Sequence, residues 1–445
     1  MSSLFNLPTS DSIPDPSSAT DRITLEEVAP RSSSLDGAVT IEFTSSPSRW
    51  FSPSDSYLVI GCNVHAAQYT AADAAAGTAA FYSWDALAYN ESSGVAFARN
   101  AGAAFFSTVS LQVNGVLMGT ISNPAQIGGV LTMTESTREY LETVGSNEFT
   151  QIDKAKRAKS AWGIPNADNT ARTAFEIIYR PPMGFLRTMK AFPGARITLT
   201  FNVAPEYGSR VITSIDPSVA YTAVSKDLTT PTAMTDVRVQ LTSLKYYAAM
   251  MTPLNNPTIP SNALVPMYEI ASSAHQLPVN LAAASLQTIS FNVPASTFKI
   301  GIAVQPASVG NGVISARNEI SGFNWAYVQH LSVNYAGYQG GSGAYTNARN
   351  QPERPFADFS TAILAAQQGR ASALDLYNWG AAPLYLFRFA KPANDVSSNA
   401  TVRIRLTDTL TESVNVFCFA YYQSTAALSY DSSGMVTGAE YAYAS

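Results

Sequence analysis

Residues 105–115, with the sequence FFSTVSLQVNG, indicate the fold of this chain most directly. Apolar and polar residues alternate along the stretch, which is the pattern of a β-strand buried on one face. It ends on Asn114 and Gly115, and Asn-Gly between two apolar runs is the strongest short signal for a β-hairpin, because a two-residue turn needs positive φ angles. We therefore predict a strand that ends in a structural turn at Asn114 and Gly115.

A second copy of this pattern lies in the other half of the chain. Residues 325–335, WAYVQHLSVNY, begin 220 positions after residue 105 in a chain of 445 residues. Aromatic residues again lead into an alternating strand that ends on an asparagine, Asn334, although Tyr335 replaces the glycine of the first copy. We predict a second structural turn at Asn334.

The segments around the two copies also recur in the same order. A strand-like segment precedes each copy, a helical segment follows it, and a β-rich pair of segments comes next. Several matched elements in one order indicate two copies of one β-rich domain. The matched pairs are 56–64 with 297–304, 134–145 with 358–369, and 196–201 with 402–406.

The composition fits a protein with two large cores and a weakly charged surface. Apolar residues make up 46% of the chain and charged residues only 13%. Such surfaces are common where the surface contacts other protein, although a soluble β protein of low charge is an equal interpretation. The net charge of −5 gives no global signal for nucleic-acid binding.

The N-terminal 36 residues form a segment of their own, rich in Ser and Pro. They hold six acidic residues and two arginines, so we do not expect them to bind a genome. We interpret them as an irregular arm that docks on protein. The expected organisation is an arm at 1–36, a first β-domain at 37–225, a linker at 226–235, a second β-domain at 236–430 and a tail at 431–445.

Two cysteines, Cys62 and Cys418, sit inside apolar strands, which favours buried free thiols over a disulfide. The N-terminus lacks the basic and apolar regions of a signal peptide. No apolar run approaches the roughly 18–20 residues of a membrane span. We therefore expect synthesis in the cytoplasm.

One dense basic cluster consists of Lys154, Lys156, Arg157 and Lys159. A contact with nucleic acid or lipid phosphate is one interpretation. A solvated face or a subunit contact is the interpretation that we favour, because most short charge runs are solvated.

Residues for catalysis, for a metal or for a cofactor are not apparent. The three histidines, His65, His275 and His330, have no metal-binding spacing, and the chain has no P-loop, paired-cysteine motif or nucleophile elbow. Residues 296–299 match Ser-x-x-Lys by letter only. We predict a protein that is not an enzyme and that carries no cofactor and no metal.

Several segments together resemble the double jelly-roll major capsid proteins, most closely those of virophages and of polinton-like (adintovirus-like) DNA viruses. The likeness spans about residues 37–440. In that family a Phe-Ser-x-Val-x-Leu-x-Asn-Gly strand precedes a helix of the type Tyr-x-x-Tyr-Leu-Glu-Thr. The segments that carry the resemblance are 104–116, 135–145, 175–179, 193–201, 237–247, 417–422 and 429–436.

The resemblance implies an all-β fold of two tandem antiparallel eight-stranded jelly-roll sandwiches with short helices in the connecting loops. It implies a major capsid protein whose homotrimers form pseudo-hexameric capsomers of an icosahedral shell around DNA, often over an internal membrane. The implied partners are further copies of this chain and minor or penton capsid proteins, without sequence-specific nucleic-acid binding, and the implied location is the virion.

An alternative function is an attachment or penton-like protein, or a carbohydrate-binding protein, built on a β-sandwich. The 22 tyrosines and the Tyr-bearing loop at 336–355 favour it. Particle mass separates the two functions, because a shell protein assembles and a binding module does not.

Overall fold

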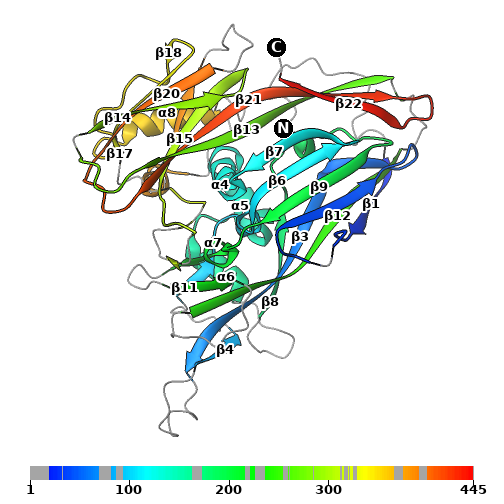
Figure 1. Ribbon diagram of the computed structural model, residues 1–445, viewed down its shortest axis with the longest axis horizontal. Coiled ribbons are helices and arrows are strands. Elements are labelled where there is room, and N and C mark those ends of the chain that lie inside the picture. Colours follow the sequence, from blue (N-terminus) through cyan, green and yellow to red (C-terminus); the bar gives the residue numbers. More distant parts are fainter. Residues whose placement is uncertain are drawn as a thin grey trace.

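Antiparallel β-strands dominate the computed structural model, which also contains several short helices (Figure 1). The structure describes residues 20–32, 34–69, 82–86, 94–162, 173–215, 221–225, 236–253, 259, 261–283, 285–310, 313–314, 319, 321–323, 328–364, 374–389 and 398–443. Most strands form two sandwiches, and each sandwich consists of a long and a short sheet. Strands β5 (Val95–Phe97) and β10 (Ile212–Ser214) form a separate two-stranded sheet.

In the first sandwich the long sheet has the order β1-β12-β3-β8 and the short sheet β2-β9-β6-β7. The long strands are β1 (Thr20–Val28), β12 (Asp236–Pro253), β3 (Trp50–Tyr69) and β8 (Ala174–Tyr179). The short-sheet strands are β2 (Ala38–Thr44), β9 (Arg196–Val203), β6 (Phe106–Val113) and β7 (Val116–Ser122). Added to the far end of the long sheet are β4 (Tyr82–Ala86), β11 (Tyr221–Ser225) and β16 (Val313–Ile314).

The second sandwich repeats this pairing strand for strand. Its long sheet has the order β13-β21-β15-β19, with β22 beside β21, and its short sheet the order β14-β20-β17-β18. The long-sheet strands are β13 (Asn262–Leu277), β21 (Val414–Tyr430), β15 (Thr297–Pro306), β19 (Tyr385–Arg388) and β22 (Val436–Tyr443). The short-sheet strands are β14 (Leu286–Val293), β20 (Ser398–Leu406), β17 (Val328–Tyr335) and β18 (Tyr338–Gln339).

This correspondence confirms the all-β fold of two antiparallel sandwiches predicted from the sequence repeat. The two strands quoted first, now β6 and β17, occupy the same place in their sheets. Alternation explains the burial, because Val109, Leu111 and Val113 of β6 point inward and are fully buried. Each such side chain contributes about 1.5–3 kcal/mol to stability.

The hairpin turns of the two sandwiches have the same backbone geometry. Asn114 and Gly115, with φ angles of 51° and 82°, join Val113 to its partner Val116. In the second sandwich Ala336 and Gly337, at 50° and 82°, join Tyr335 to Tyr338.

The prediction of a turn at Asn334 is therefore wrong. Asn334 lies inside β17 and pairs with Gln339. The turn comes two residues later, where Gly337 supplies a residue that adopts positive φ at no steric cost. Alternation along the strand cannot detect a displacement of two residues, because it leaves the same side chains on the buried face.

Short helices fill the connections and one end of each sandwich. The predicted helix at 134–145 is instead the end of α4, the whole of α5 and the start of η1. Ser136 is extended and ends α4, and Thr137 caps α5 by accepting a hydrogen bond from the Tyr140 amide at 3.2 Å. The predicted helix at 358–369 corresponds to α8, which begins five residues earlier, and residues 365–369 lie outside the described ones. The helices are α3 (Ala101–Ala104), α4 (Pro124–Glu135), α5 (Arg138–Glu142), α6 (Lys154–Trp162), α7 (Tyr207–Val211), α8 (Glu353–Leu364) and α9 (Leu376–Ala381), with 3-10 turns η1 (Val144–Glu148) and η2 (Phe185–Arg187).

The described parts of the two terminal segments each contain a strand that the sequence did not predict. Residues 20–28 of the presumed irregular arm form β1, which pairs antiparallel with β12. Residues 436–443 of the presumed tail form β22, which pairs with β21 across a turn at Asp431 and Gly434. The Asp431 carboxylate stabilises this turn by accepting hydrogen bonds from the amides of Ser433 and Met435 at 2.8 and 3.0 Å.

The boundary between the sandwiches also differs from the expected linker at 226–235. Strand β12 opens within the region assigned to the second domain, yet it pairs with β3 and β1 of the first sandwich. We propose a division between Pro253 and Asn262, the last residue of β12 and the first of β13.

Candidate functional site: the joint between the two sandwiches

Buried apolar residues of both sandwiches form one continuous core cluster. Three groups of polar contacts also join the two sandwiches. The long strands β13, β21 and β22 of the second sandwich extend over the β6 and β7 end of the first (Figure 1). The groups lie in the loop after β15, beneath β13, and at the turn between β21 and β22.

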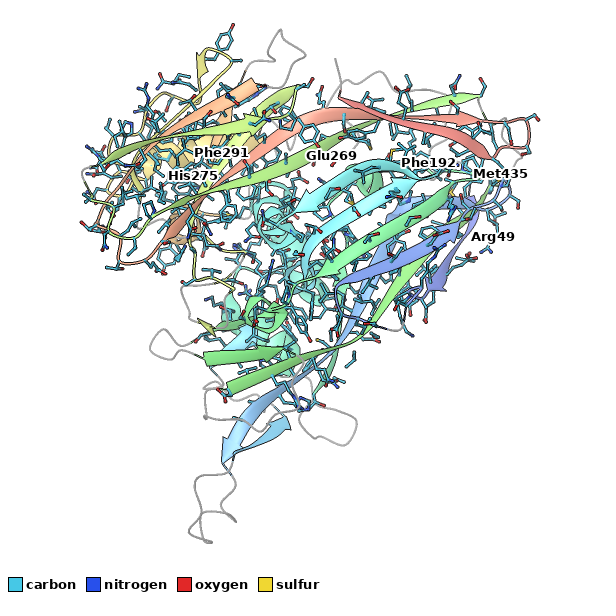
Figure 2. All side chains as sticks on the ribbon, in the orientation of Figure 1. Arg49, Phe192, Glu269, His275, Phe291 and Met435 are labelled. Atoms are coloured by element: carbon cyan, nitrogen blue, oxygen red, sulfur yellow. The ribbon has the colours of Figure 1, made fainter. Side chains whose placement is uncertain are left out.

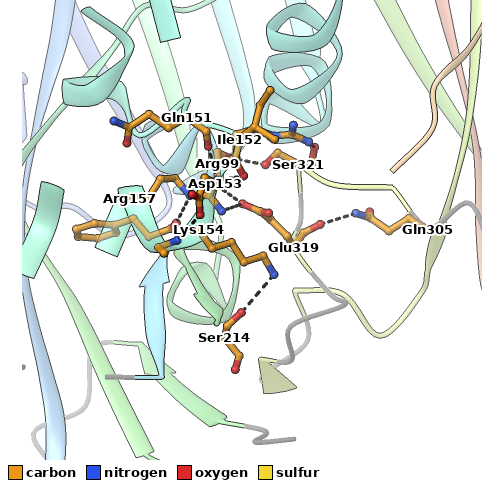
Figure 3. Close-up of polar contacts among 12 residues, drawn as sticks. Arg99, Gln151, Ile152, Asp153, Lys154, Arg157, Ser214, Gln305, Glu319 and Ser321 are labelled. Carbon is orange, nitrogen blue, oxygen red and sulfur yellow. Dashed lines mark hydrogen bonds and ion pairs between the residues drawn. The ribbon is translucent and has the colours of Figure 1, made fainter. Parts of the chain in front are cut away.

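The first group, which we call the ion cluster, consists of Arg99, Lys154, Arg157, Glu319 and Ser321 (Figure 3). Arg157 on α6 is fully buried, and its guanidinium donates to the Glu319 carboxylate at 2.7 Å. The Arg157 Nε also donates to the Phe97 carbonyl at 2.8 Å. This arginine therefore connects the first sandwich to the loop that follows β15 of the second.

Arg99 strengthens the ion cluster from a neighbouring position. Its backbone amide donates to the Glu319 carboxylate, and its guanidinium donates to the Ser321 carbonyl at 2.7 Å. The Ser321 hydroxyl in turn donates to the Arg99 carbonyl. Two chain segments that lie 222 positions apart are thus joined by hydrogen bonds in both directions.

The electrostatics of the ion cluster favour charged Glu319. Burial by itself would raise the pKa of this carboxyl, but the positive charges of Arg157, Lys154 and Arg99 outweigh burial and the pKa lies below its ordinary value. Burial lowers the pKa of Arg99 and that of Lys154. A buried charge is stable only when its partners compensate it, so removing one partner lowers the stability of the fold by roughly 3–5 kcal/mol.

The predicted basic cluster is divided by this arrangement. Arg157 belongs to the buried ion cluster, and Lys154 donates to the Ser214 carbonyl at 3.2 Å. Lys156 and Lys159 are exposed, and Lys156 pairs with Glu142 at 3.1 Å. The structure thus does not present the four side chains on one face, as a phosphate contact would require.

The second group, which we call the carboxylate cluster, consists of Glu135, Arg187 and Tyr268 and lies beneath β13. Arg187 of η2 donates to Glu135 at the end of α4 and to the Tyr268 hydroxyl of β13, the latter at 2.6 Å. Its guanidinium also lies 4.7 Å from the centre of the Tyr268 ring, within the range of a cation–π contact. Two elements of the first sandwich are thus fixed to one strand of the second.

Two further ionisable side chains, those of Glu269 and Lys299, are buried in this region. Burial raises the pKa of Glu269 to about 7, although the Gly184 amide donates to it. Burial lowers the pKa of Lys299 to about 8, and its ammonium lies 4.7 Å from the centre of the Tyr421 ring. Figure 2 shows Glu269 between β13 and the first sandwich.

The third group, the turn contact, joins the first hairpin turn to the C-terminal hairpin. The Asn114 side chain accepts from the Arg196 amide at 2.8 Å and donates to the Val436 carbonyl. The Val436 amide donates to the Gly194 carbonyl at 3.0 Å. The predicted turn residue Asn114 thus has a second role in the joint.

Sequence reasoning missed Arg99, Arg187, Glu269, Lys299 and Glu319. For Glu269 and Lys299 a signal existed, because each stands alone inside an apolar strand segment, MYEIA and TFKIG. A lone charge at such a position is rarely buried unless it has partners. Glu319 lies in a loop, and nothing local distinguishes it.

The described residues offer no group of three or more His, Cys, Asp or Glu side chains placed to bind a metal ion. Neither Cys62 nor Cys418 forms a disulfide, and both are buried. Among the described helices, none is long and apolar enough to cross a membrane.

Neither protein-family models nor curated protein sequences match this chain. Solved structures do match. A chain of the Sputnik virophage, solved by cryo-EM, superposes with a TM-score of 0.61 at 13% identity, covering 99% of this chain and 92% of that chain. The major capsid protein of mavirus gives 0.56 at 11% identity, covering 98% and 92%. The PBCV-1 capsid protein gives 0.51 at 11% identity, covering 95% and 97%.

At these identities the comparisons establish the fold alone. The fold is the double jelly roll of virophage and giant-virus major capsid proteins, as the sequence resemblance implied. Because the superposition covers nearly all of both chains, it includes both sandwiches and the joint between them.

Proposed function

We propose that this chain is a major capsid protein whose homotrimers form the pseudo-hexameric capsomers of an icosahedral DNA-virus shell. One observation carries the proposal: two sandwiches that share the pairing of eight strands are fixed to each other by buried ionic and hydrogen-bonded contacts. Three such chains present six similar corners, and a cyclic arrangement closes on itself without leaving an interface open.

The role is mechanical, without catalysis and without a cofactor. A shell subunit must keep the angle between its two sandwiches constant, because neighbours bind to both. The ion cluster and the carboxylate cluster supply this constancy, since a buried charge that leaves its partner loses several kcal/mol.

The proposed partners are further copies of the chain, then minor and penton capsid proteins, and an internal membrane beneath the shell. Sequence-specific binding of nucleic acid is not part of the proposal. The proposed location is the virion, after synthesis in the host cytoplasm.

Electron microscopy of the purified protein tests this proposal. We expect closed icosahedral particles, or flat hexagonal arrays of capsomers when closure fails. A dispersed population of single chains at high protein concentration, under several salt conditions, would contradict it.

A second candidate function, attachment or sugar binding, is favoured by exposed aromatic side chains on the second sandwich. Tyr338 is 60% exposed and Tyr377 is 84% exposed. Exposed tyrosines suit both sugar contacts and protein contacts. Glycan binding by a stable monomer, lost in Tyr377→Ala, would favour this alternative.

A further inference from the structure

All four residues of the turn at 336–339 in the second sandwich are exposed, whereas Asn114 and Val116 of the corresponding turn in the first sandwich are half-buried. Asn114 of the first turn is held by the Val436 carbonyl of the C-terminal hairpin. The two turns share their φ angles and their place in the sheet, so the difference lies in what is next to them.

Strand β13 lies against β7, the strand that leads out of the first turn. The Glu269 carboxylate of β13 is 3.3 Å from the position that a Cβ atom on Gly119 would occupy. Ser272 of β13 also donates to the Ser122 carbonyl at 2.7 Å. The contact between the sandwiches therefore includes one long edge strand, β13, and one hairpin, β6–β7.

The counterpart of β13 in the first sandwich is β1. In the first sandwich Leu244 of β12 pairs with Ile60 of β3. Tyr246, two residues further along β12, pairs with Val28 of β1. In the second sandwich Ala420 of β21 pairs with Ile300 of β15, the residue that corresponds to Ile60. Tyr422, two residues further along β21, pairs with Glu269 of β13. Val28 of β1 thus occupies the place that Glu269 holds in β13.

Within the described residues β1 pairs with β12 alone, so its other edge is open. Open edge strands are normally covered or made unattractive to other strands, because their free amides and carbonyls recruit partners. On β1, Ile23 is 47% and Leu25 is 49% exposed. Strand β1 corresponds to β13, and the β17–β18 hairpin corresponds to β6–β7. Among the described residues, these two elements do not pack against each other within the chain.

We propose that the turn at 336–339 of one copy docks on β1 of the next copy, near Leu25 and Val28. The contact between chains then repeats, with β17–β18 and β1, the contact that β6–β7 and β13 make within the chain. This inference rests on the ring of three chains proposed above. A ring of three chains has six contacts between sandwiches, three within chains and three between chains, in alternation. Every β1 strand and every turn at 336–339 is then covered.

Cross-linking between copies tests this docking. In the double variant Leu25→Cys/Tyr338→Cys, a short bismaleimide should join neighbouring chains, giving dimers and trimers on a denaturing gel. The native cysteines should not react, because Cys62 and Cys418 are buried and burial raises the pKa of Cys418 to about 12. The control is Leu264→Cys/Tyr338→Cys, since Leu264 is an exposed residue of β13 itself. We expect no ladder there.

Native mass spectrometry of the same samples separates this inference from the proposed function. A trimer without a ladder in the Leu25/Tyr338 variant would overturn the docking and leave the capsid function standing. A monomer would overturn both. A second variant, Tyr338→Glu, should raise the dissociation constant of the trimer at least about tenfold, whereas Leu264→Glu should leave it unchanged.

Discussion

The side-chain amide of Asn114 donates a hydrogen bond to the backbone carbonyl of Val436, a residue 322 positions further along the chain. One asparagine thereby serves two purposes. Its backbone adopts the positive φ that the first hairpin needs, and its side chain fixes that hairpin to the last strand of the other sandwich. Local turn geometry and the union of the two sandwiches are thus linked at one residue.

Alanine at Gly115 should destabilise the chain through its backbone alone. A Cβ atom there meets nothing within 4 Å, but φ is +82°. We expect a loss of about 1–2 kcal/mol, the usual cost of a left-handed conformation for an L-residue, measured as a lower melting temperature. The control is Gly380→Ala, where a Cβ also meets nothing within 4 Å but the backbone is helical. That change should be neutral or stabilising by up to about 1 kcal/mol; equal effects of the two variants would refute the turn.

Removal of the Arg157 side chain should destabilise the joint strongly. Arg157→Met leaves the Glu319 carboxylate in the ion cluster without its principal partner, so we expect a loss of about 3–5 kcal/mol in the free energy of unfolding. The control is Arg138→Met, which breaks an exposed ion pair with Glu142 and should cost less than about 1 kcal/mol. The double variant Arg157→Met/Glu319→Gln should recover part of the loss. A single variant as stable as the control would mean that the cluster does not hold the joint.

Glu269 should make stability fall as pH rises from about 4.5 to about 7. Its pKa in the folded chain is raised to about 7 by burial, from an ordinary value of 4.5. Between these values the folded chain keeps a proton that the unfolded chain has lost, so folding becomes less favourable with rising pH. The difference corresponds to about 3 kcal/mol at most.

The variant Glu269→Gln tests this pH dependence, because glutamine stays neutral. At pH 8 it should melt at a higher temperature than the parent chain, and at pH 4.5 the two should agree. The matched control, Glu139→Gln, changes an exposed side chain and should leave the profile of the parent unchanged. A Glu269→Gln profile that parallels the parent at every pH would contradict the assignment.

Deleting residues 2–30 should have a larger effect than an irregular arm would allow. The deletion removes β1, with its Glu27–Lys245 ion pair of 2.9 Å, and leaves one side of β12 unpaired. We expect a lower melting temperature and loss of trimers, whereas deletion of residues 2–19 retains all of β1. Circular dichroism melting and light scattering measure the two effects. Identical behaviour of the two deletions would show that β1 contributes nothing.

The sequence predicted those parts of the fold that depend on alternation and on strong turn residues. Strands β6 and β17 were found in this way, and so was the turn at Asn114, because Asn-Gly has few other conformational choices. It failed at Asn334, where an Ala-Gly turn two residues later leaves the alternation unchanged. It also failed for β1 and β22, whose alternation is weak and whose pairing partners are distant in the chain.

The joint was harder to predict because its members come from separate loops and strands. Arg157 was noticed only as one of four neighbouring basic residues, and Glu319, its partner, lies 162 positions away. Such pairings follow from the packing of whole sandwiches and not from any local pattern. The lone ionisable residues inside apolar strand segments, Glu269 and Lys299, were the only local indication of a buried polar joint.

The most direct test of the central claim is the mass of the assembled unit under mild dissociation. Native mass spectrometry of the full-length chain should show a homotrimer, with three times the chain mass of 47.5 kDa, as the dominant species at micromolar concentration. A stable monomer that forms no trimer at that concentration, and no particles at higher concentration, would contradict the capsid function.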